Sequence, residues 1–311
     1  MSNNSKISIV SPVYGAEGIV HILVKEIEES VKKITDDYEI LLIEDKSPDK
    51  SWVEIVEIAA SNTKVKGVKL SRNFGQHNAI AAGMEIASGD YVILLDCDLQ
   101  HNPKYIIDLY KKINEGYDIV YAKFISRKHG FFKNLSAKLY YRFLKFTSDF
   151  DMDPNIGSFS ILSRKVVDAF NQFNDYKKTY LLALKWIGFN YSTIDVKHRK
   201  RTKGKSGYSL KKLLIHSLSI SIANSDKLLY ISFYIGIITS LLSFLGIFII
   251  ILRYFIVGAL EGWSSLIIVI MFFSGLILTT LGITSVYLGK VYEQTKGRPR
   301  YLISKKINFN D

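Results

Sequence analysis

Two long, uncharged apolar stretches limit what this chain can fold into more than any other feature of its sequence. They run from Tyr230 to Leu252 and from Gly262 to Gly289. A helix that crosses a bilayer needs about 20 apolar residues, so each stretch is long enough to span a membrane. The alternative is a pair of buried core helices, but such helices rarely exceed about 20 residues. We therefore expect two transmembrane helices, at about 230–252 and 264–289.

The charges that flank these stretches predict their orientation. Residues 196–225 contain many Lys and Arg residues and no acid, more basic residues follow Gly289, and the connecting loop carries only Arg253 and Glu261. Because basic flanks remain in the cytoplasm, we expect an inner or plasma membrane protein with both termini and the N-terminal part cytoplasmic. Apolar residues at helical spacing between Leu210 and Ser221 predict an amphipathic helix at the membrane surface.

Composition excludes several classes of protein. The chain has 19 Tyr and 18 Phe, which is incompatible with a disordered chain. Its single cysteine, Cys97, excludes an intrachain disulfide framework. A net charge of +12 requires an anionic partner, for which nucleic acid, nucleotide phosphates and an anionic membrane are the alternatives.

The part of the chain before the apolar stretches alternates between strand and helix patterns. Short β-branched runs predict strands over 6–11, 38–44, 65–70 and 91–95. Helical patterns cover 19–34, 52–60, 79–87 and 103–114. This alternation predicts an α/β domain with a mostly parallel sheet and helices on both faces.

Polar side chains follow each predicted strand, and ligands of such sheets bind at the carboxyl ends of the strands. Asp96 and Asp98 follow the fourth strand, and two carboxylates separated by one residue at a strand end can bind one divalent cation. A solvated turn rich in Asp is the alternative. Neither the G-x-G-x-x-G motif of dinucleotide-binding domains nor a P-loop occurs, which argues against NAD binding and ATP hydrolysis. His77 and His101 lie nearby, but no histidine has zinc-ligand spacing with cysteines.

Five strings in a fixed order resemble the family 2 inverting glycosyltransferases, and in particular those similar to dolichol-phosphate mannose synthase and the bacterial polyprenyl-phosphate (undecaprenyl-phosphate) glycosyltransferases. The strings are IVSPVY from Ile9, LSRNFGQHNAIAAG from Leu70, LLDCDLQHNP from Leu94, GSF from Gly157 and GKSGYSLKKLL from Gly204. The resemblance extends over nearly the whole chain, including the paired apolar stretches and the terminal GRPRYLI.

The resemblance implies a GT-A fold, a nucleotide-diphosphate sugar as donor and Mg²⁺ or Mn²⁺ as cofactor, with UDP the nucleotide that the breadth of the family favours. It implies that Asp98, Arg127 and Arg201 are catalytic. The implied donor-binding residues are Pro12, Tyr14, Glu17, Asp45, Arg72, Asp96 and Ser158. The implied metal ligands are Asp96, Asp98 and Gln100, and the implied acceptor-phosphate ligands are Arg127, Arg142 and Arg201.

The chain departs from many relatives in two of these motifs, and the second departure bears on the acceptor. Gly15 and Ala16 replace the Asn and Glu of a P-x-Y-N-E loop, and Ser158 replaces the Asp of G-D-F-R, which is a candidate base in bacterial relatives. A sugar hydroxyl needs a base to become a nucleophile, whereas a lipid monophosphate is largely ionised at neutral pH. The sequence therefore favours sugar transfer to a polyprenyl phosphate. Transfer to a lipid-linked saccharide in cell-envelope polysaccharide synthesis and a non-catalytic membrane scaffold are the alternatives.

These observations predict four regions. Residues 1–195 form the cytoplasmic GT-A domain, 196–227 a basic juxtamembrane segment, 228–290 the transmembrane hairpin and 291–311 a basic cytoplasmic tail. The acid-free, basic and aromatic segment 119–148 is expected to lie at an anionic membrane, the alternative being an ordinary helix packed on the sheet. We expect no nucleic acid partner, because no RNA-binding module signature occurs. The sequence leaves association into a homo-oligomer open.

Overall fold

The computed structural model describes residues 5–125, 153, 155–175, 178–197, 199, 227–257 and 262–309. The chain divides into two compact units. The first contains the N-terminal domain together with the C-terminal segment from Arg298, and the second contains the two long apolar helices.

The first half of the N-terminal domain alternates strand and helix as the sequence predicts. Strands β1, β2, β3 and β4 span Ile7–Val13, Tyr38–Glu44, Val65–Leu70 and Tyr91–Leu94. Helices α1, α2 and α3 span Val20–Val31, Ser51–Ser61 and Gln76–Ile86, and the turn η1 (Pro103–Tyr105) leads into α4 (Ile106–Ile113).

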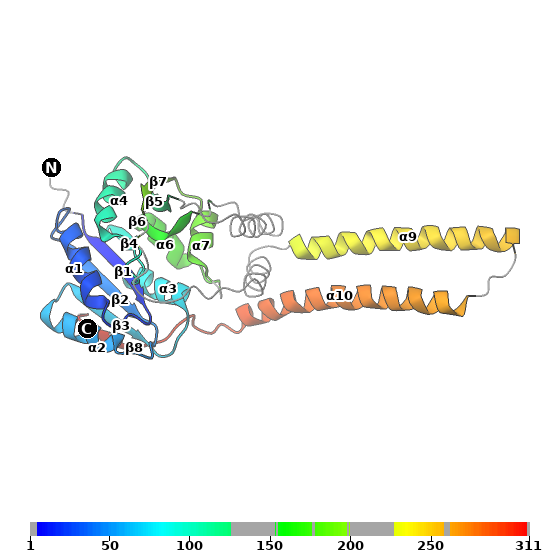
Figure 1. The fold of residues 1–311 in the computed structure, drawn as a ribbon, viewed down its shortest axis with the longest axis horizontal. Coiled ribbons are helices and arrows are strands. Elements are labelled where there is room, and N and C mark those ends of the chain that lie inside the picture. The colour runs from blue at the N-terminus through cyan, green and yellow to red at the C-terminus, as the bar shows by residue number, and fades with distance from the viewer. Residues whose placement is uncertain are drawn as a thin grey trace. The chain divides into compact units, whose positions relative to one another are not determined.

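The second half adds elements that the sequence does not predict. They are β5 (Ile119–Phe124), β6 (Ile156–Ser163), α6 (Arg164–Gln172), α7 (Tyr180–Ile187) and β7 (Tyr191–Val196). The last strand, β8 (Ile303–Ile307), comes from the C-terminal segment. The eight strands of the described residues form one sheet in the order β7-β5-β6-β4-β1-β2-β3-β8 (Figure 1).

The sheet is mostly parallel, as the sequence predicts, but the strands β6 and β8 run antiparallel to the others. Strands β1, β2, β3 and β4 pair in parallel, as do β5 and β7, whereas β6 runs antiparallel to both β4 and β5 and β8 runs antiparallel to β3. The α/β fold class with helices on both faces is confirmed, because alternate side chains of the central strands enter two separate cores. Ile9 and Ile40 pack with α1, α2 and α4, whereas Val10 and Leu41 pack with α3, α6 and α7.

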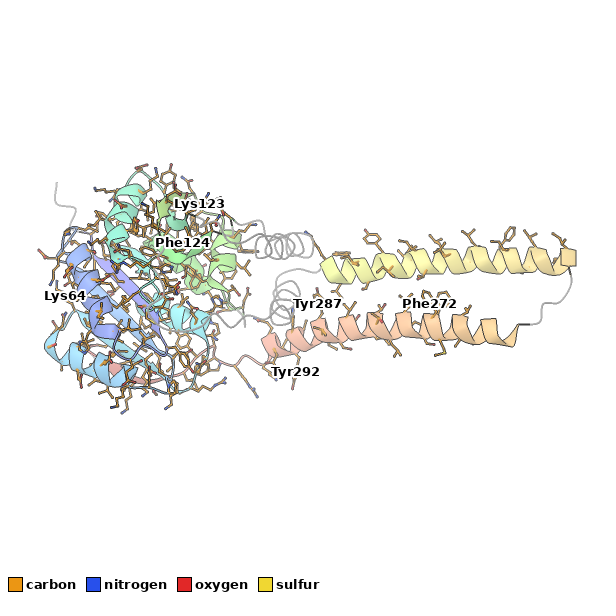
Figure 2. All side chains as sticks on the ribbon, viewed as in Figure 1. Lys64, Lys123, Phe124, Phe272, Tyr287 and Tyr292 are labelled. Atoms are coloured by element: carbon orange, nitrogen blue, oxygen red, sulfur yellow. The ribbon has the colours of Figure 1, made fainter. Side chains whose placement is uncertain are left out.

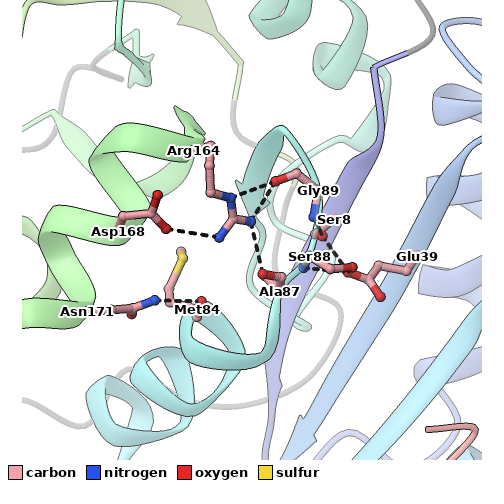
Figure 3. Close-up of polar contacts among 9 residues, drawn as sticks. All are labelled: Ser8, Glu39, Met84, Ala87, Ser88, Gly89, Arg164, Asp168 and Asn171. Carbon is pink, nitrogen blue, oxygen red and sulfur yellow. Dashed lines mark hydrogen bonds and ion pairs between the residues drawn. The ribbon is translucent and has the colours of Figure 1, made fainter. Parts of the chain in front are cut away.

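A polar network fixes the turn between α3 and β4, at the amino-terminal ends of the strands. The buried Glu39 accepts hydrogen bonds from Ser8 Oγ (2.6 Å), from Ser88 and from Lys66 Nζ (2.8 Å). Arg164 donates to the carbonyls of Ala87 and Gly89 from the other side (Figure 3). Gly89 packs so tightly here that a Cβ would lie 2.6 Å from the backbone nitrogen of Ser8. The network is far along the strands from the ends that carry Asp96 and Asp98, so its role is structural.

The C-terminal segment corrects one expectation, because residues 303–307 are not a separate tail but the edge strand β8. Its pairing continues beyond the strand, since the Ser71 N–H donates to the Leu302 carbonyl at 2.8 Å. Asn308, with a φ of 60°, donates from Nδ2 to the carbonyls of Ala59 (2.7 Å) and Val65 (2.8 Å). This segment lies far from β3 in the sequence, so a local pattern carries no signal of the pairing.

The second unit contains helices α9 (Lys227–Val257) and α10 (Trp263–Thr295), which lie side by side and antiparallel. Both are long and apolar enough to cross a membrane, over Leu229–Gly246 and Val269–Thr295. Only 6% and 0% of these windows are buried, so they are not core helices of the described structure. Phe272 and Tyr292, for example, are each 62% exposed on α10 (Figure 2).

Candidate active site

A cavity of about 380 Å³ lies at the carboxyl ends of the central strands. It is built from the loops after β1, β2, β3 and β4, which is where ligands of such sheets bind. Its lining consists of Pro12, Val13, Tyr14, Asp45, Asn73, Gly75, Gln76, Ala79, Asp96, Cys97 and Asp98. The structure thus brings together five of the residues predicted from the sequence, namely Pro12, Tyr14, Asp45, Asp96 and Asp98.

Asp96 is held from two sides. Its Oδ1 accepts a hydrogen bond of 2.7 Å from Gln76 Nε2, at the first turn of α3, and its Oδ2 accepts one of 2.7 Å from Ser158 Oγ on β6. Hydrogen bonds to a carboxylate fix its orientation and are stronger than bonds between neutral groups. Ser158 is not among the residues that line the cavity, so its connection to the site is the hydrogen bond to Asp96.

A tight turn places Asp98 beside Asp96. The backbone of Leu99 adopts a φ of 57°, and Asp98 Oδ1 accepts the Gln100 N–H at 3.1 Å. Gln100, expected as a metal ligand, is not among the residues that line the cavity. Its carbonyl accepts the Arg199 N–H at 3.1 Å, which ties the turn to the segment after β7.

The donor set of the cavity suits a hard divalent cation. Asp96 and Asp98 contribute carboxylate oxygens, and Mg²⁺ typically takes one or two carboxylates plus phosphate and water oxygens. Burial raises the pKa of the Cys97 thiol to about 11, so Cys97 supplies no thiolate at neutral pH. Among the described residues no group of three His, Cys, Asp or Glu side chains could hold a metal. Phosphate oxygens of a bound substrate and water are the further ligands that Mg²⁺ typically takes.

Asp45 lines the cavity and also holds the backbone of the loop that follows β3. Its two carboxylate oxygens accept the N–H groups of Phe74 (2.7 Å) and Gly75 (2.8 Å). Burial raises the pKa of Asp45, and these two bonds oppose that rise. Gly75 has a φ of 91°, which favours glycine because a Cβ is strained there. The loop that carries Gln76 into α3 is therefore fixed by Asp45.

The first loop is fixed by the segment that follows β2. The N–H groups of Gly15, Ala16, Glu17 and Gly18 donate to side chains between Ser47 and Glu54. These donors are satisfied within the protein, so the loop is not a phosphate-binding nest. Tyr14 is 52% exposed and lines the cavity, whereas Glu17 is not among the lining residues and its carboxylate accepts the Lys50 N–H at 3.4 Å.

The comparisons with known proteins decide the family. The sequence profile of Glycosyl transferase family 2 matches residues 8–170, which carry the entire cavity lining. The chain belongs to glycosyltransferase family 2. Its fold is the GT-A fold of that family, and the predicted resemblance is confirmed.

Relatives of this glycosyltransferase align over almost its whole length. YkcC of Bacillus subtilis, an uncharacterized glycosyltransferase, is 35% identical over 100% of this chain and 97% of its own. The SfII prophage-derived bactoprenol glucosyl transferase of Shigella flexneri is 31% identical, over 98% of this chain and 99% of its own. The undecaprenyl-phosphate 4-deoxy-4-formamido-L-arabinose transferase of Photorhabdus laumondii is 28% identical over 98% and 95%. A mycobacterial protein of known crystal structure shares the fold, with a TM-score of 0.51 and 16% identity over 72% of this chain and 77% of its own.

The sequence of this glycosyltransferase does not predict two of the side chains that lie near Asp96. Gln76 lies in the LSRNFGQ string, but only the fold brings it to Asp96. His101 stacks between Phe124 (5.1 Å) and Phe159 (5.4 Å), and its Nδ1 lies 3.9 Å from Asp96 Oδ2. Burial lowers the pKa of His101, and the charges of Asp96 and Asp98 oppose this effect.

The remaining predicted residues divide into two groups. Arg72 is exposed, stacks on the Phe74 ring at 4.4 Å and is not among the cavity-lining residues. The three predicted phosphate ligands Arg127, Arg142 and Arg201 lie outside the described residues, as does the predicted amphipathic helix between Leu210 and Ser221. Their roles remain predictions.

Proposed function

We propose that this family 2 member is a membrane-bound inverting glycosyltransferase that moves a sugar from a nucleotide-diphosphate sugar to a polyprenyl phosphate. The observation that carries the proposal is the pair Asp96 and Asp98 in one cavity, on a chain that aligns end to end with transferases named for undecaprenyl phosphate and bactoprenol. Full-length alignment matters because it includes the apolar helices as well as the sugar-transfer domain.

The donor would occupy the cavity with its diphosphate toward the two aspartates. A bound Mg²⁺ or Mn²⁺, held by Asp96 and Asp98, would supply Lewis-acid stabilisation of the leaving diphosphate. Tyr14 and Asn73 offer polar groups elsewhere in the cavity for the nucleoside and the sugar. UDP remains the expected nucleotide.

The acceptor would act without a carboxylate base at position 158. The Ser158 hydroxyl donates a hydrogen bond to Asp96. It therefore orients the aspartate and does not act as a base that removes a proton from an acceptor. A phosphate monoester has a second pKa near 6 and is largely dianionic at pH 7, so its oxygen is already a nucleophile. Attack in line with the departing diphosphate inverts the anomeric carbon, and Arg127 and Arg201 remain the predicted partners of the acceptor phosphate.

The connectivity of the sheet supports the membrane topology. β7 precedes the two apolar helices and β8 follows them, yet both strands belong to the same sheet. The chain must therefore leave and re-enter one folded domain, so helices α9 and α10 together make an even number of crossings. Together with the basic residues on both flanks, this supports our proposal that the catalytic domain and both termini are cytoplasmic.

A transfer assay tests the proposal. The full chain in lipid nanodiscs is incubated with undecaprenyl phosphate, Mg²⁺ and a panel of radiolabelled nucleotide sugars. We expect label in a lipid product that mild acid hydrolyses, as a sugar phosphate linked to a lipid should be. A parallel reaction contains a lipid-linked saccharide instead of undecaprenyl phosphate, and a product stable to mild acid that forms only there would support the alternative acceptor. No transfer from any donor to either acceptor would contradict the enzyme assignment.

A further inference from the structure

Trp186 is the most exposed of the large apolar side chains described in the first unit. Its exposed fraction is 79%, at the last turn of α7, and Gly188 ends that helix in the left-handed conformation with a φ of 73°. A single exposed apolar residue is ordinary on a protein surface. The surroundings of Trp186 are what distinguish it.

Trp186 is exposed but has a rigid support. Its ring packs edge to face on Phe173, with centroids 4.8 Å apart and an interplanar angle of 81°. The Phe173 carbonyl accepts hydrogen bonds from Arg300 Nη1 at 2.7 Å and from the buried Lys178 Nζ at 3.4 Å. The support of Trp186 is thereby tied to the C-terminal segment, of which Tyr301 also donates to Glu85.

Chain length limits how far this support can lie from the second apolar helix. Helix α10 ends at Thr295, and Arg300 follows five residues later. An extended chain spans at most about 3.6 Å per residue, so Arg300 lies within ~18 Å of the helix end. Of the intervening residues, Lys296 is ion-paired with Glu293 at 2.7 Å, and Arg298 adds basic charge.

We propose that Trp186 inserts into the headgroup layer of an anionic lipid bilayer and anchors the catalytic domain there. The proposal rests on the proposed function, since it requires that α10 crosses the membrane. Tryptophan is enriched at the membrane–water interface, where its ring is partly apolar and its N–H is hydrated. Arg298 and Arg300 supply the positive charge that an anionic headgroup layer attracts. These features favour a bilayer over a second copy of the chain as the partner of this surface.

Tryptophan fluorescence can test this proposal, because the chain has three tryptophans, Trp52, Trp186 and Trp263. The full chain is placed in anionic nanodiscs with or without a phospholipid that carries a nitroxide quencher on its headgroup. The fluorescence of the wild-type protein minus that of Trp186→Phe is the contribution of Trp186, and this difference is measured both with and without the quencher. This comparison changes only one exposed residue and therefore carries little risk to folding. We expect the quencher to remove more than half of the Trp186 fluorescence.

Two further measurements show what a negative result would mean. The difference between wild type and Trp263→Phe reports whether the start of α10 meets the bilayer. If the Trp263 signal is quenched and the Trp186 signal is not, the Trp186 proposal is wrong and the membrane hairpin stands. If neither is quenched, the membrane part of the proposed function fails as well. Protection of Trp186 from both lipid nitroxide and aqueous acrylamide would indicate a second protein copy on this surface and would also overturn the proposal.

Discussion

The Ser71 N–H donates a hydrogen bond of 2.8 Å to the carbonyl of Leu302, a residue that follows the second apolar helix. Ser71 begins the loop that leads to Gly75 and Gln76, both of which line the cavity. The C-terminal segment thus supports one wall of the candidate active site. A chain that ended after α10 would lack both the edge strand and this support.

We expect Asn308→Ala to destabilise the catalytic domain. The Asn308 side chain bonds the carbonyls of Ala59 and Val65, and losing such bonds costs about 1–3 kcal/mol in the free energy of unfolding. Chemical denaturation followed by circular dichroism measures the change. Lys305→Ala, an exposed residue of the same strand, is the control and should lie within about 0.5 kcal/mol of wild type. Equal stabilities for the two variants would mean that Asn308 does not hold the segment in place.

Gln76→Ala should weaken metal-dependent sugar transfer without unfolding the protein. Its amide orients Asp96, and removing a group that orients a metal ligand typically costs about 10–100-fold in metal affinity or activity. The measurement is the Mg²⁺ concentration that gives half-maximal transfer. Gln172→Ala, an exposed glutamine at the end of α6, serves as the matched control. An unchanged Mg²⁺ requirement would show that the bond from Gln76 is not needed.

Ser158→Ala and Ser158→Asp should differ. The alanine variant removes the second bond to Asp96 and should resemble Gln76→Ala in its Mg²⁺ requirement. The aspartate variant introduces a carboxylate where an oxygen now lies 2.7 Å from Asp96, so repulsion between like charges should impair donor binding further. Calorimetric titration with nucleotide in the presence of Mg²⁺ compares the two. Tighter binding by Ser158→Asp would contradict this reading of position 158.

Glu39 should make the stability of the domain depend on pH. Burial raises its pKa, but the bonds from Lys66, Ser8 and Ser88 outweigh burial and lower the pKa to about 2 from an ordinary value of 4.5. The carboxylate therefore stabilises the fold at pH values above about 4.5, and this stabilisation is lost as the pH falls toward 2.

The Glu39→Gln variant tests this dependence. Its free energy of unfolding should be lower than that of wild type at pH 7 by an amount of the order of 3 kcal/mol. The difference should shrink as the pH falls from 5 to 3. Glu57→Gln, an exposed glutamate of α2, is the control. A difference that stays constant over this range would mean that ionisation of Glu39 contributes nothing.

The sequence predicts the first half of the domain well because its signals are local. The ranges 38–44 and 65–70 coincide with β2 and β3, since β-branched runs bounded by polar turns mark buried parallel strands. The same reasoning brings Asp45, Asp96 and Asp98 to one edge of the sheet, where they line one cavity.

The sequence does not predict features that depend on pairing between strands far apart in the chain. Strand β6 inserts antiparallel between β4 and β5, and β8 arrives from beyond the apolar helices. Neither pairing leaves a local pattern, so the contact between Ser158 and Asp96 was not predictable. The first loop shows the same limit, because Glu17 matches a family position but its backbone and side chain are engaged with residues 49 and 50.

The central claim is that Asp96 and Asp98 hold a metal-bound diphosphate in the cavity. Isothermal titration of the full chain with UDP and with GDP, each with Mg²⁺ or with EDTA, tests it most directly, with Asp98→Asn as the variant and the exposed Asp108→Asn as the control. We expect Mg²⁺-dependent binding of one nucleotide by wild type and Asp108→Asn, and a loss of at least about 100-fold in Asp98→Asn and in EDTA. Binding that is equally tight in Asp98→Asn, or that EDTA leaves unchanged, would contradict the claim.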